Sequence, residues 1–197
     1  MARMFPPPID DPGLLPLLPG ELSSVLAAEN GFIRFGGGLH VRGACLTPDW
    51  HSLRHSWTGA GAFSRLYPVL APSDVPFGQD CMGDQFILRG ATVHRLSAED
   101  GSLESLGISL NQFFRACAAN PTEFLSAQPL LQLEAEGSSL SPGELILAYP
   151  PFCTKESGSG VRLSACPAEQ VITFHARLAA KLASIPDGGA LEITVEP

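Results

Sequence analysis

The chain lacks long apolar segments. None of its apolar runs approaches the roughly 20 residues that a helix needs to cross a bilayer. Residues 1–8 end in Pro6-Pro7-Pro8 and hold no apolar segment of the kind found in secretory signals. We therefore expect a cytoplasmic protein without a membrane partner. Of its 197 residues, 45% are hydrophobic and 16% are charged, which is typical of a globular protein.

The sequence also lacks paired cysteines. Its 5 cysteines are widely spaced, and no two of them form a C-x-x-C pair of the kind that binds zinc. An odd number of scattered cysteines in a protein expected to be cytoplasmic predicts buried free thiols rather than disulfides or metal ligands. The cysteines are Cys45, Cys81, Cys117, Cys153 and Cys166.

Basic residues are few. The chain has 12 Lys and Arg against 20 Asp and Glu, for a net charge of −8. Phosphate binding needs clustered basic residues, so we expect no nucleic acid partner. The acidic surface has two interpretations: it could steer the protein toward a basic partner, or it could serve only to keep the protein in solution.

Known catalytic motifs are missing as well. There is no G-x-S-x-G elbow, no phosphate-binding G-x-x-x-x-G-K-[ST] loop and no H-E-x-x-H pair. His51 and His55 have the spacing of metal ligands on a helix, but Ser52 stands where a zinc protease has Glu, so we expect exposed or hydrogen-bonded histidines. Asp80 would raise the pKa of the neighbouring Cys81 thiol rather than activate it. These patterns predict no catalytic residue, no metal and no cofactor.

The most informative stretch is 76–90. Residues 76–84 are rich in Gly and Asp, which are typical of a compact turn, with Asp80 and Asp84 as turn-forming residues. The apolar run 86–88 predicts a strand, and Arg89-Gly90-Ala91 predicts a tight connection to a second strand at 91–96. We therefore expect a β-hairpin that the chain enters through an ordered turn.

Elements before this hairpin follow from local signals. Residues 1–17 predict an extended, proline-rich arm, and a helix should begin at Leu18-Pro19 and end at Asn30-Gly31. Strands at 32–35 and 39–41 should form a hairpin through the glycines 36–38, because no helix or Gly-Lys-Ser/Thr follows to make a phosphate loop. Thr47-Pro48 predicts the start of a short helix to about Ser56, with Trp50, Leu53 and Trp57 on one face.

Elements after the hairpin are also predicted. A polar turn is expected at 97–101, and Ser109 with Gln112 forms a capping box for a helix that places Leu110, Phe113, Phe114 and Cys117 inward. A turn capped by Asn120 should follow. Further on, the patterns predict strands at 132–136, 145–149 and 191–196, a flexible loop at 155–160, and an amphipathic helix at 169–182.

Together these elements predict one α+β domain. A single mixed or antiparallel β-sheet should be flanked by helices and carry a C-terminal α/β extension. The expected boundaries are an arm at 1–17, a core at 18–126 and an extension at 127–197 that packs on the same domain.

Several motifs in residues 18–125 resemble the SUKH superfamily, which includes fungal cell-wall-synthesis regulators and bacterial immunity proteins. The resemblance rests on the order and spacing of Leu18-Pro19, Asn30-Gly31, Phe77-Gly78-x-Asp80-x-x-Gly83-Asp84-x-Phe86, Val93-His94-Arg95-Leu96, Glu99-Asp100-Gly101, Phe113-Phe114 and Pro121-x-x-Phe124-Leu125. The arm and the residues after about 127 lie outside it.

This resemblance implies a protein-binding scaffold that is not an enzyme and has no cofactor. For bacterial members it implies direct binding of a toxin, often a nuclease or deaminase; the alternative is an intracellular regulatory or scaffold role. A third hypothesis is a hydrolase that uses His51 or His55.

The candidate site residues follow from the same motifs. Asp80 and Asp84 are candidates for partner binding, and Trp50 and Trp57 are candidate interface anchors if they are exposed. Each also has a structural interpretation, in the turn or in the core. The structural motif residues are Phe77, Gly78, Gly83 and Phe86. The sequence does not indicate the oligomeric state.

Overall fold

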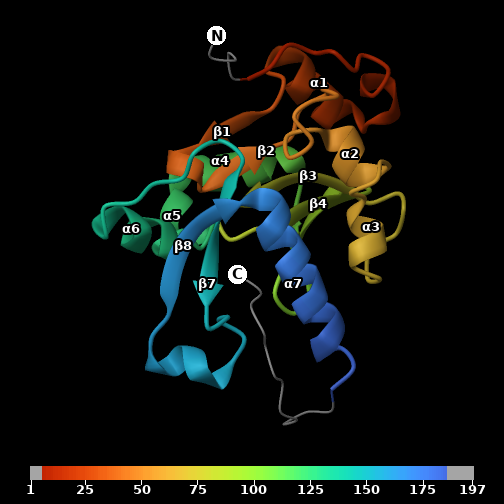
Figure 1. Cartoon of the computed structure of the whole chain (residues 1–197). Helices are drawn as coiled ribbons and strands as arrows, with labels where there is room; N and C mark the ends of the chain where they lie inside the picture. The colour runs from red at the N-terminus through yellow and green to blue at the C-terminus, as the bar shows by residue number, and fades with distance from the viewer. Residues whose placement is uncertain (1–5, 186–197) are drawn as a thin grey trace.

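The structure is a computed structural model that describes residues 6–185, and it consists of two antiparallel sheets with surrounding helices (Figure 1). The larger sheet has 6 strands that lie in chain order. They are β1 (Phe32–Arg34), β2 (Leu39–Val41), β3 (Val75–Asp80), β4 (Gln85–Arg89), β5 (Thr92–Leu96) and β6 (Leu103–Ile108). The smaller sheet pairs β7 (Glu144–Tyr149) with β8 (Arg162–Pro167). The α+β class is confirmed, and every strand pairing is antiparallel within the described residues.

Helices cover both sheets. The longer ones are α1 (Gly20–Ala28), α4 (Leu110–Ala119), α6 (Gln128–Ala135) and α7 (Ala168–Leu182). Shorter helices are α2 (Leu53–Trp57), α3 (Phe63–Leu66) and α5 (Pro121–Phe124), with 3-10 turns η1 (Leu15–Leu17), η2 (Phe35–Gly37) and η3 (Lys155–Ser159). In Figure 1, α2 and α3 lie beside β3 and β4, while α7 runs in front of the larger sheet. No helix among residues 6–185 combines the length and apolar character that crossing a membrane requires.

Local sequence signals account for several elements. Ser109 and Gln112 form the predicted capping box at the start of α4, where the Ser109 hydroxyl accepts from the Gln112 amide. The β1–β2 hairpin, helix α1, the β4–β5 hairpin, strand β7 and helix α7 are likewise confirmed within a few residues of their predicted bounds. In each case the signal is contained in a short stretch of chain.

The prediction of a turn across residues 76–84 is wrong in its first half. Residues Val75–Asp80 form strand β3, which is buried along its whole length between β2 and β4. A glycine is needed here because a Cβ on Gly78 would stand 2.9 Å from the His40 carbonyl oxygen of β2. The true turn is confined to residues 81–84, where Gly83 adopts φ +91°, a conformation that other residues rarely adopt.

The helix predicted from Thr47 also begins later. Ser52 caps α2 by accepting a hydrogen bond from the His55 amide, and the helix starts at Leu53. The chain just before the helix pairs with a remote residue instead: the Gly43 amide donates to the His51 carbonyl oxygen, and the Leu53 amide donates to the Gly43 carbonyl oxygen, each at 2.9 Å. Trp50 therefore lies outside the helix and does not share a helical face with Trp57.

Three other expectations need correction or fall outside the described residues. Residues 132–136 belong mostly to helix α6 rather than to a strand, and the loop at 155–160 contains η3. Strands β6 and β8 were not predicted. The strand expected at 191–196 lies outside the described residues.

The proline-rich arm is docked on the core. It contains η1, and Leu14 just before that turn is 0% exposed. The Asp11 carboxylate forms an ion pair with Arg54 of α2, and the Asp11 amide donates to the Ala44 carbonyl oxygen. Residues 6–17 are thus part of the packed structure rather than an extended arm without regular structure.

Aromatic side chains form the centre of the main core. Phe77 of β3 and Phe86 of β4 are both 0% exposed. The ring of Phe113 from α4 lies 5.4 Å from the Phe77 ring and 4.7 Å from the Phe86 ring. Phe124 of α5 packs on Phe113 at 5.6 Å. Such ring pairs add to the stabilisation that comes from burying apolar area.

The C-terminal residues pack on the same core. Ile146 and Ala148 of β7 and Leu163 of β8 belong to the same apolar cluster as Phe77 and Phe86. Helix α7 places Ala176 and Ala179 in a second cluster with Ile87 and Leu96 of the larger sheet. One backbone hydrogen bond, from the Ile146 amide to the Cys81 carbonyl oxygen at 2.8 Å, links β7 to the β3–β4 turn.

The cysteines differ in exposure. Cys45, Cys81 and Cys117 are buried, as predicted, but Cys153 is exposed and Cys166 is partly exposed. The prediction of buried thiols is therefore wrong for Cys153, which lies in the connection between β7 and β8.

We expect Phe113→Ala to lower the free energy of unfolding by about 3–5 kcal/mol, because the cavity would open where α4, α5, β3 and β4 meet. Chemical denaturation measures the change. The matched control is Phe35→Ala, since Phe35 is 38% exposed. A loss for Phe113→Ala no larger than that of the control would contradict this account of the core.

Candidate functional site

Arg95 of β5 binds two carboxylates of the central motif. Its Nη2 donates to the Asp80 carboxylate at 2.6 Å, and its Nε donates to the Asp84 carboxylate at 2.9 Å. The other Asp80 oxygen accepts from the backbone amides of Met82 and Asp84 at 2.9 and 3.1 Å. The second Asp84 oxygen accepts from the Ala98 amide at 2.9 Å. This Asp80–Arg95–Asp84 cluster holds the β3–β4 turn against β5 and the turn that follows it.

Two carboxylates facing one guanidinium leave a negative charge in excess. Burial and the nearby Asp84 raise the pKa of Asp80 to about 7, although Arg95 and the two amides act in the opposite direction. Burial acts to lower the pKa of Arg95, but both carboxylates together raise it above its ordinary value. Arg95 is therefore charged at neutral pH.

The residues of the central motif lie in the core, in the turn and at the surface. Phe77 and Phe86 lie in the core, and Gly78 and Gly83 occupy positions with little room for a side chain. Asp80 is 1% exposed, so its carboxylate faces the interior rather than a partner. The Asp84 side chain is 20% exposed and lines a hollow.

This hollow, which we call the His175 hollow after one of its lining residues, has a volume of about 390 Å³. Helix α7, the β3–β4 turn, strand β5 with the turn that follows it, the α5–α6 segment and the β7–β8 connection border it. Its walls include Met82, Asp84, Arg95, Glu99, Asp100, Phe152, Cys153 and His175. The Glu99 carboxylate accepts from the Phe152 and Cys153 amides at 3.1 and 2.7 Å, which ties the β7–β8 connection to the β5–β6 turn.

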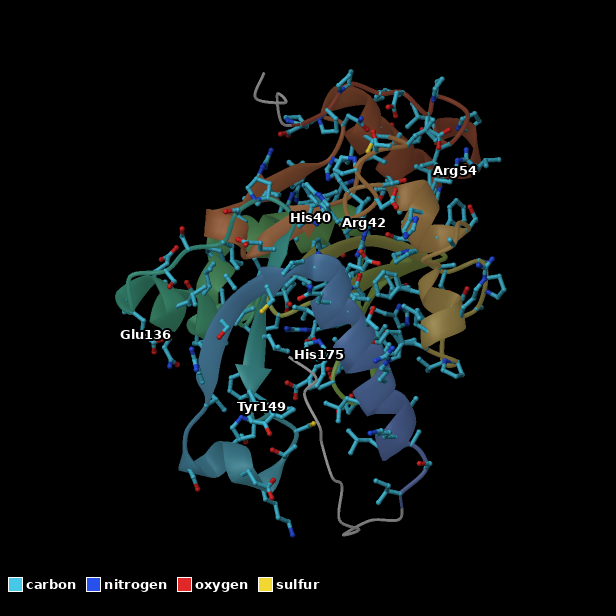
Figure 2. The ribbon with its side chains drawn as sticks, viewed as in Figure 1. His40, Arg42, Arg54, Glu136, Tyr149 and His175 are labelled. Atoms are coloured by element: carbon cyan, nitrogen blue, oxygen red, sulfur yellow. The ribbon has the colours of Figure 1, made fainter. Side chains whose placement is uncertain are left out.

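His175 lies on the inner face of α7 (Figure 2) and is 1% exposed. Among residues 6–185, neither of its ring nitrogens has a hydrogen-bond partner. Burial lowers the pKa of His175 to about 4, so the ring is neutral at physiological pH. The sequence analysis overlooked this residue, although its spacing from Val171 and Leu178 places it on the apolar face of the predicted helix.

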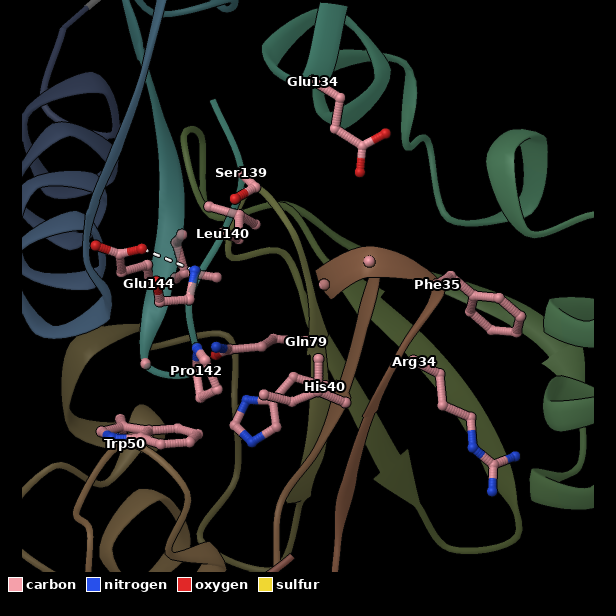
Figure 3. A pocket seen from close by; sticks show the side chains of 16 residues that line it. Arg34, Phe35, His40, Trp50, Gln79, Glu134, Ser139, Leu140, Pro142 and Glu144 are labelled. Carbon is pink, nitrogen blue, oxygen red and sulfur yellow. Dashed lines mark hydrogen bonds between the residues drawn. The ribbon is translucent and has the colours of Figure 1, made fainter. Parts of the chain in front are cut away.

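A separate hollow of about 350 Å³ contains Trp50 (Figure 3). His40, Trp50 and Gln79 form one side of this Trp50 hollow, and Glu134 of α6 and Glu144 of β7 lie on the other. The indole of Trp50 is partly buried. It packs on the cluster of Leu145, Ala168 and Val171, and a Cβ on Gly143 would stand 2.9 Å from the indole nitrogen.

Behind the Trp50 hollow lies a pair of buried histidines. His40 Nε2 and His51 Nδ1 are 2.8 Å apart, and His51 Nε2 lies 3.2 Å from the Asn30 carbonyl oxygen. Burial lowers the pKa of both, that of His51 to about 4. His51 is thus hydrogen-bonded inside the protein, whereas His55 is partly exposed near Asp49. Because α2 begins at Leu53, the two histidines do not share a helical face.

Arg42 is another feature that the sequence analysis did not predict. It is 1% exposed and donates to the carbonyl oxygens of Pro76 and Gly78 and to the amide oxygens of Gln79 and Gln85. All these acceptors are uncharged, and burial lowers the pKa of Arg42 to about 9. Arg42 cross-links β2, β3 and β4 from inside the sheet.

The candidates that remain, Trp57 and Cys81, contact other parts of the protein. Trp57 packs partly against the core, and its indole N–H donates to the Pro72 carbonyl oxygen at 3.0 Å. Burial, together with the charge of Asp80, raises the pKa of Cys81, in the predicted direction. Among residues 6–185, no group of three or more His, Cys, Asp or Glu side chains is arranged to hold a metal ion. Trp50 lines one hollow, Asp84 lines the other, Asp80 is buried and Trp57 lines neither hollow. The four candidate partner-binding residues therefore do not form one surface.

We expect Arg95→Met to lower the free energy of unfolding by about 3–5 kcal/mol at pH 8, because both carboxylates would lose their cation while still partly buried. The loss should be smaller at pH 5, where Asp80, with its raised pKa, takes up a proton. Urea denaturation at both pH values measures it. Arg115→Met, on the exposed face of α4, is the control and should change stability by less than about 0.5 kcal/mol. Equal losses for the two variants would refute the role of the cluster.

We also expect buried histidines to weaken the fold in acid. A histidine whose pKa is lowered in the folded state stabilises the fold above the unfolded pKa of about 6.5 and loses that contribution as pH falls toward the folded pKa. With a folded pKa of about 4, His175 should lower the free energy of unfolding by about 2 kcal/mol between pH 7 and pH 5. His175→Leu should remove this part of the pH dependence of unfolding, whereas Thr173→Leu on the exposed face of α7 should not. An unchanged pH profile for His175→Leu would contradict the assignment.

No family model matches the chain, and comparisons with curated proteins and with solved structures find no similar protein. The resemblance to the SUKH superfamily, and the toxin-binding role that it implies, therefore stay predictions from the sequence. The functional proposal depends on the geometry of the two hollows and on the surface around them.

Proposed function

We propose that the chain is a non-enzymatic, cytoplasmic protein that binds a protein partner, and that it acts as an immunity protein against a basic toxin domain. The observation that carries the proposal is the His175 hollow, where acidic side chains meet exposed aromatic residues. The nuclease or deaminase class of the toxin comes from the SUKH resemblance.

The surface beside the hollow has the composition of a protein interface. Phe152, which lines the hollow, is 45% exposed, and Tyr149 at the end of β7 (Figure 2) is 47% exposed. Large aromatic side chains bordered by polar groups are typical of the residues that dominate binding energy in protein complexes. The β7–β8 connection thus offers apolar anchors next to a polar cavity.

The charge of the hollow favours a basic partner. Asp84, Glu99 and Asp100 line it, and its one described cation, Arg95, is already bound by Asp80 and Asp84. A net charge of −8 for the whole chain adds a long-range attraction. Such an attraction speeds association and weakens as salt is added.

We expect the purified chain to bind the basic toxin domain encoded by the adjacent gene, with an affinity that falls between low and moderate salt. Titration calorimetry measures binding, and growth of cells that produce the toxin measures neutralisation. Binding together with rescue would support the proposal. Binding to a kinase or a cell-wall-synthesis protein, without rescue from any toxin, would replace it with the regulatory alternative.

We expect Phe152→Ala to weaken this binding about tenfold, because an aromatic anchor at an interface contributes more than 1 kcal/mol when it is central. Asp100→Asn should mainly slow association and reduce the salt dependence. Leu131→Ala is the control, since Leu131 is 51% exposed on α6 and lines neither hollow. If all three variants bound as tightly as the unmodified chain, the partner would use another surface.

A further inference from the structure

His175 is a polar side chain with no evident structural role. It is 1% exposed, and both ring nitrogens lack a partner among the described residues. Buried polar groups in proteins are hydrogen-bonded with few exceptions, because an unpaired one carries a desolvation penalty. A leucine would fill the same place on the apolar face of α7 without that penalty. None of residues 6–185 therefore compensates for the burial of the polar atoms of the ring.

The ring borders the hollow, with both nitrogens beneath its surface. His175 lines the hollow from the side of α7, and its Nδ1 lies 3.8 Å from the position of a Cβ on Gly83. That position also lies 3.2 Å from Leu145 Cδ1, so Gly83 lets the β3–β4 turn pack closely beside the ring. A volume of about 390 Å³ is within the range of cavities that hold small ligands.

The other polar groups of the hollow determine which ligand fits. Asp84, Glu99 and Asp100 offer carboxylate oxygens, while the guanidinium of Arg95 already donates to Asp80, Asp84 and Ser126. An anion would meet this excess of negative charge at close range, whereas a cation would be attracted. A neutral histidine also has one ring nitrogen that accepts a hydrogen bond. The hollow therefore presents acceptors to a ligand that carries positive charge and several N–H groups.

We propose that the His175 hollow binds an arginine side chain of the protein partner. In this arrangement the imidazole of His175 turns toward the hollow, its accepting nitrogen takes one guanidinium N–H, and the Asp84 and Asp100 carboxylates take others nearer the surface. A guanidinium suits the site better than an ammonium, because its planar, fixed donors can serve the ring and a carboxylate at the same time. Phe152 at the rim adds an aromatic face on which a guanidinium can stack. The inference rests on the proposed function, which it makes more specific.

The inference can be tested without the partner. We would titrate the full chain with Nα-acetyl-arginine amide and follow the ring signals of His175 and the backbone amide of Ala98, which donates to Asp84. We expect these signals to shift and saturate with a dissociation constant in the millimolar range, as is typical of a small ligand. Nα-acetyl-citrulline amide has nearly the same shape without the charge, and it should bind at least about tenfold more weakly. Equal shifts with the two probes would overturn the inference.

A variant separates binding from folding. His175→Leu removes both unpaired nitrogens, so we expect it to raise the melting temperature at neutral pH by about 2–4 °C while weakening arginine-probe binding at least about tenfold. Glu21→Gln, an exposed acidic residue on α1 that lies outside the hollow, is the matched control and should bind the probe normally. A fall in melting temperature for His175→Leu would indicate a structural role for the ring and would refute the inference.

The complex with the partner distinguishes the two proposals. If the partner binds and His175→Leu binds it equally well, the arginine site is wrong while the proposed function stands. If the chain binds no partner but still binds the arginine probe, the proposed function fails, and the hollow is a site for a free cation rather than for a protein side chain. If both proposals are right, His175→Leu weakens binding of the partner, and changing one arginine of the partner weakens binding to the same extent.

Discussion

Arg95 holds two carboxylates from one turn, and much of the molecule is arranged around that contact. By binding Asp80 and Asp84 it fixes the β3–β4 turn against β5, and its third contact, with Ser126, reaches the segment between α5 and α6. The same turn accepts the Ile146 amide at the Cys81 carbonyl oxygen, so β7 is positioned by it as well. The excess negative charge of the cluster lies at the wall of the His175 hollow, which links the stability of the turn to the chemistry of the site.

The elements that could be predicted are those whose signals are local. The capping box of Ser109 and Gln112 and the hairpin around Gly90 need only a few neighbouring residues to be recognised. Strand β3 was mistaken for a turn because Pro76 and Gly78 are rare in strands, and the reason for Gly78 lies in the neighbouring strand, at the His40 carbonyl oxygen. The start of α2 depends on Gly43, which is likewise remote from the helix in sequence.

The candidate site was predictable to a smaller extent. Asp80 and Asp84 stood out as a motif, but which of them is buried depends on Arg95, a residue of another strand. His175 was hidden inside an ordinary amphipathic pattern, where a histidine at an inward position was the only signal. That signal is weak without the structure, because most inward histidines find a partner, as His40 and His51 do. Distance in sequence, rather than unusual chemistry, limited the prediction.

The bond between Glu99 and the β7–β8 connection has a consequence for how the hollow responds to an occupant. Glu99 orders this connection by accepting from the Phe152 and Cys153 amides, and its charge also belongs to the wall of the hollow. A cation that drew the carboxylate toward itself would take it away from those amides and free the loop that carries Phe152. An occupant that left Glu99 in place would keep the loop rigid. Glu99 thus connects the order of the β7–β8 connection to the charge of the hollow.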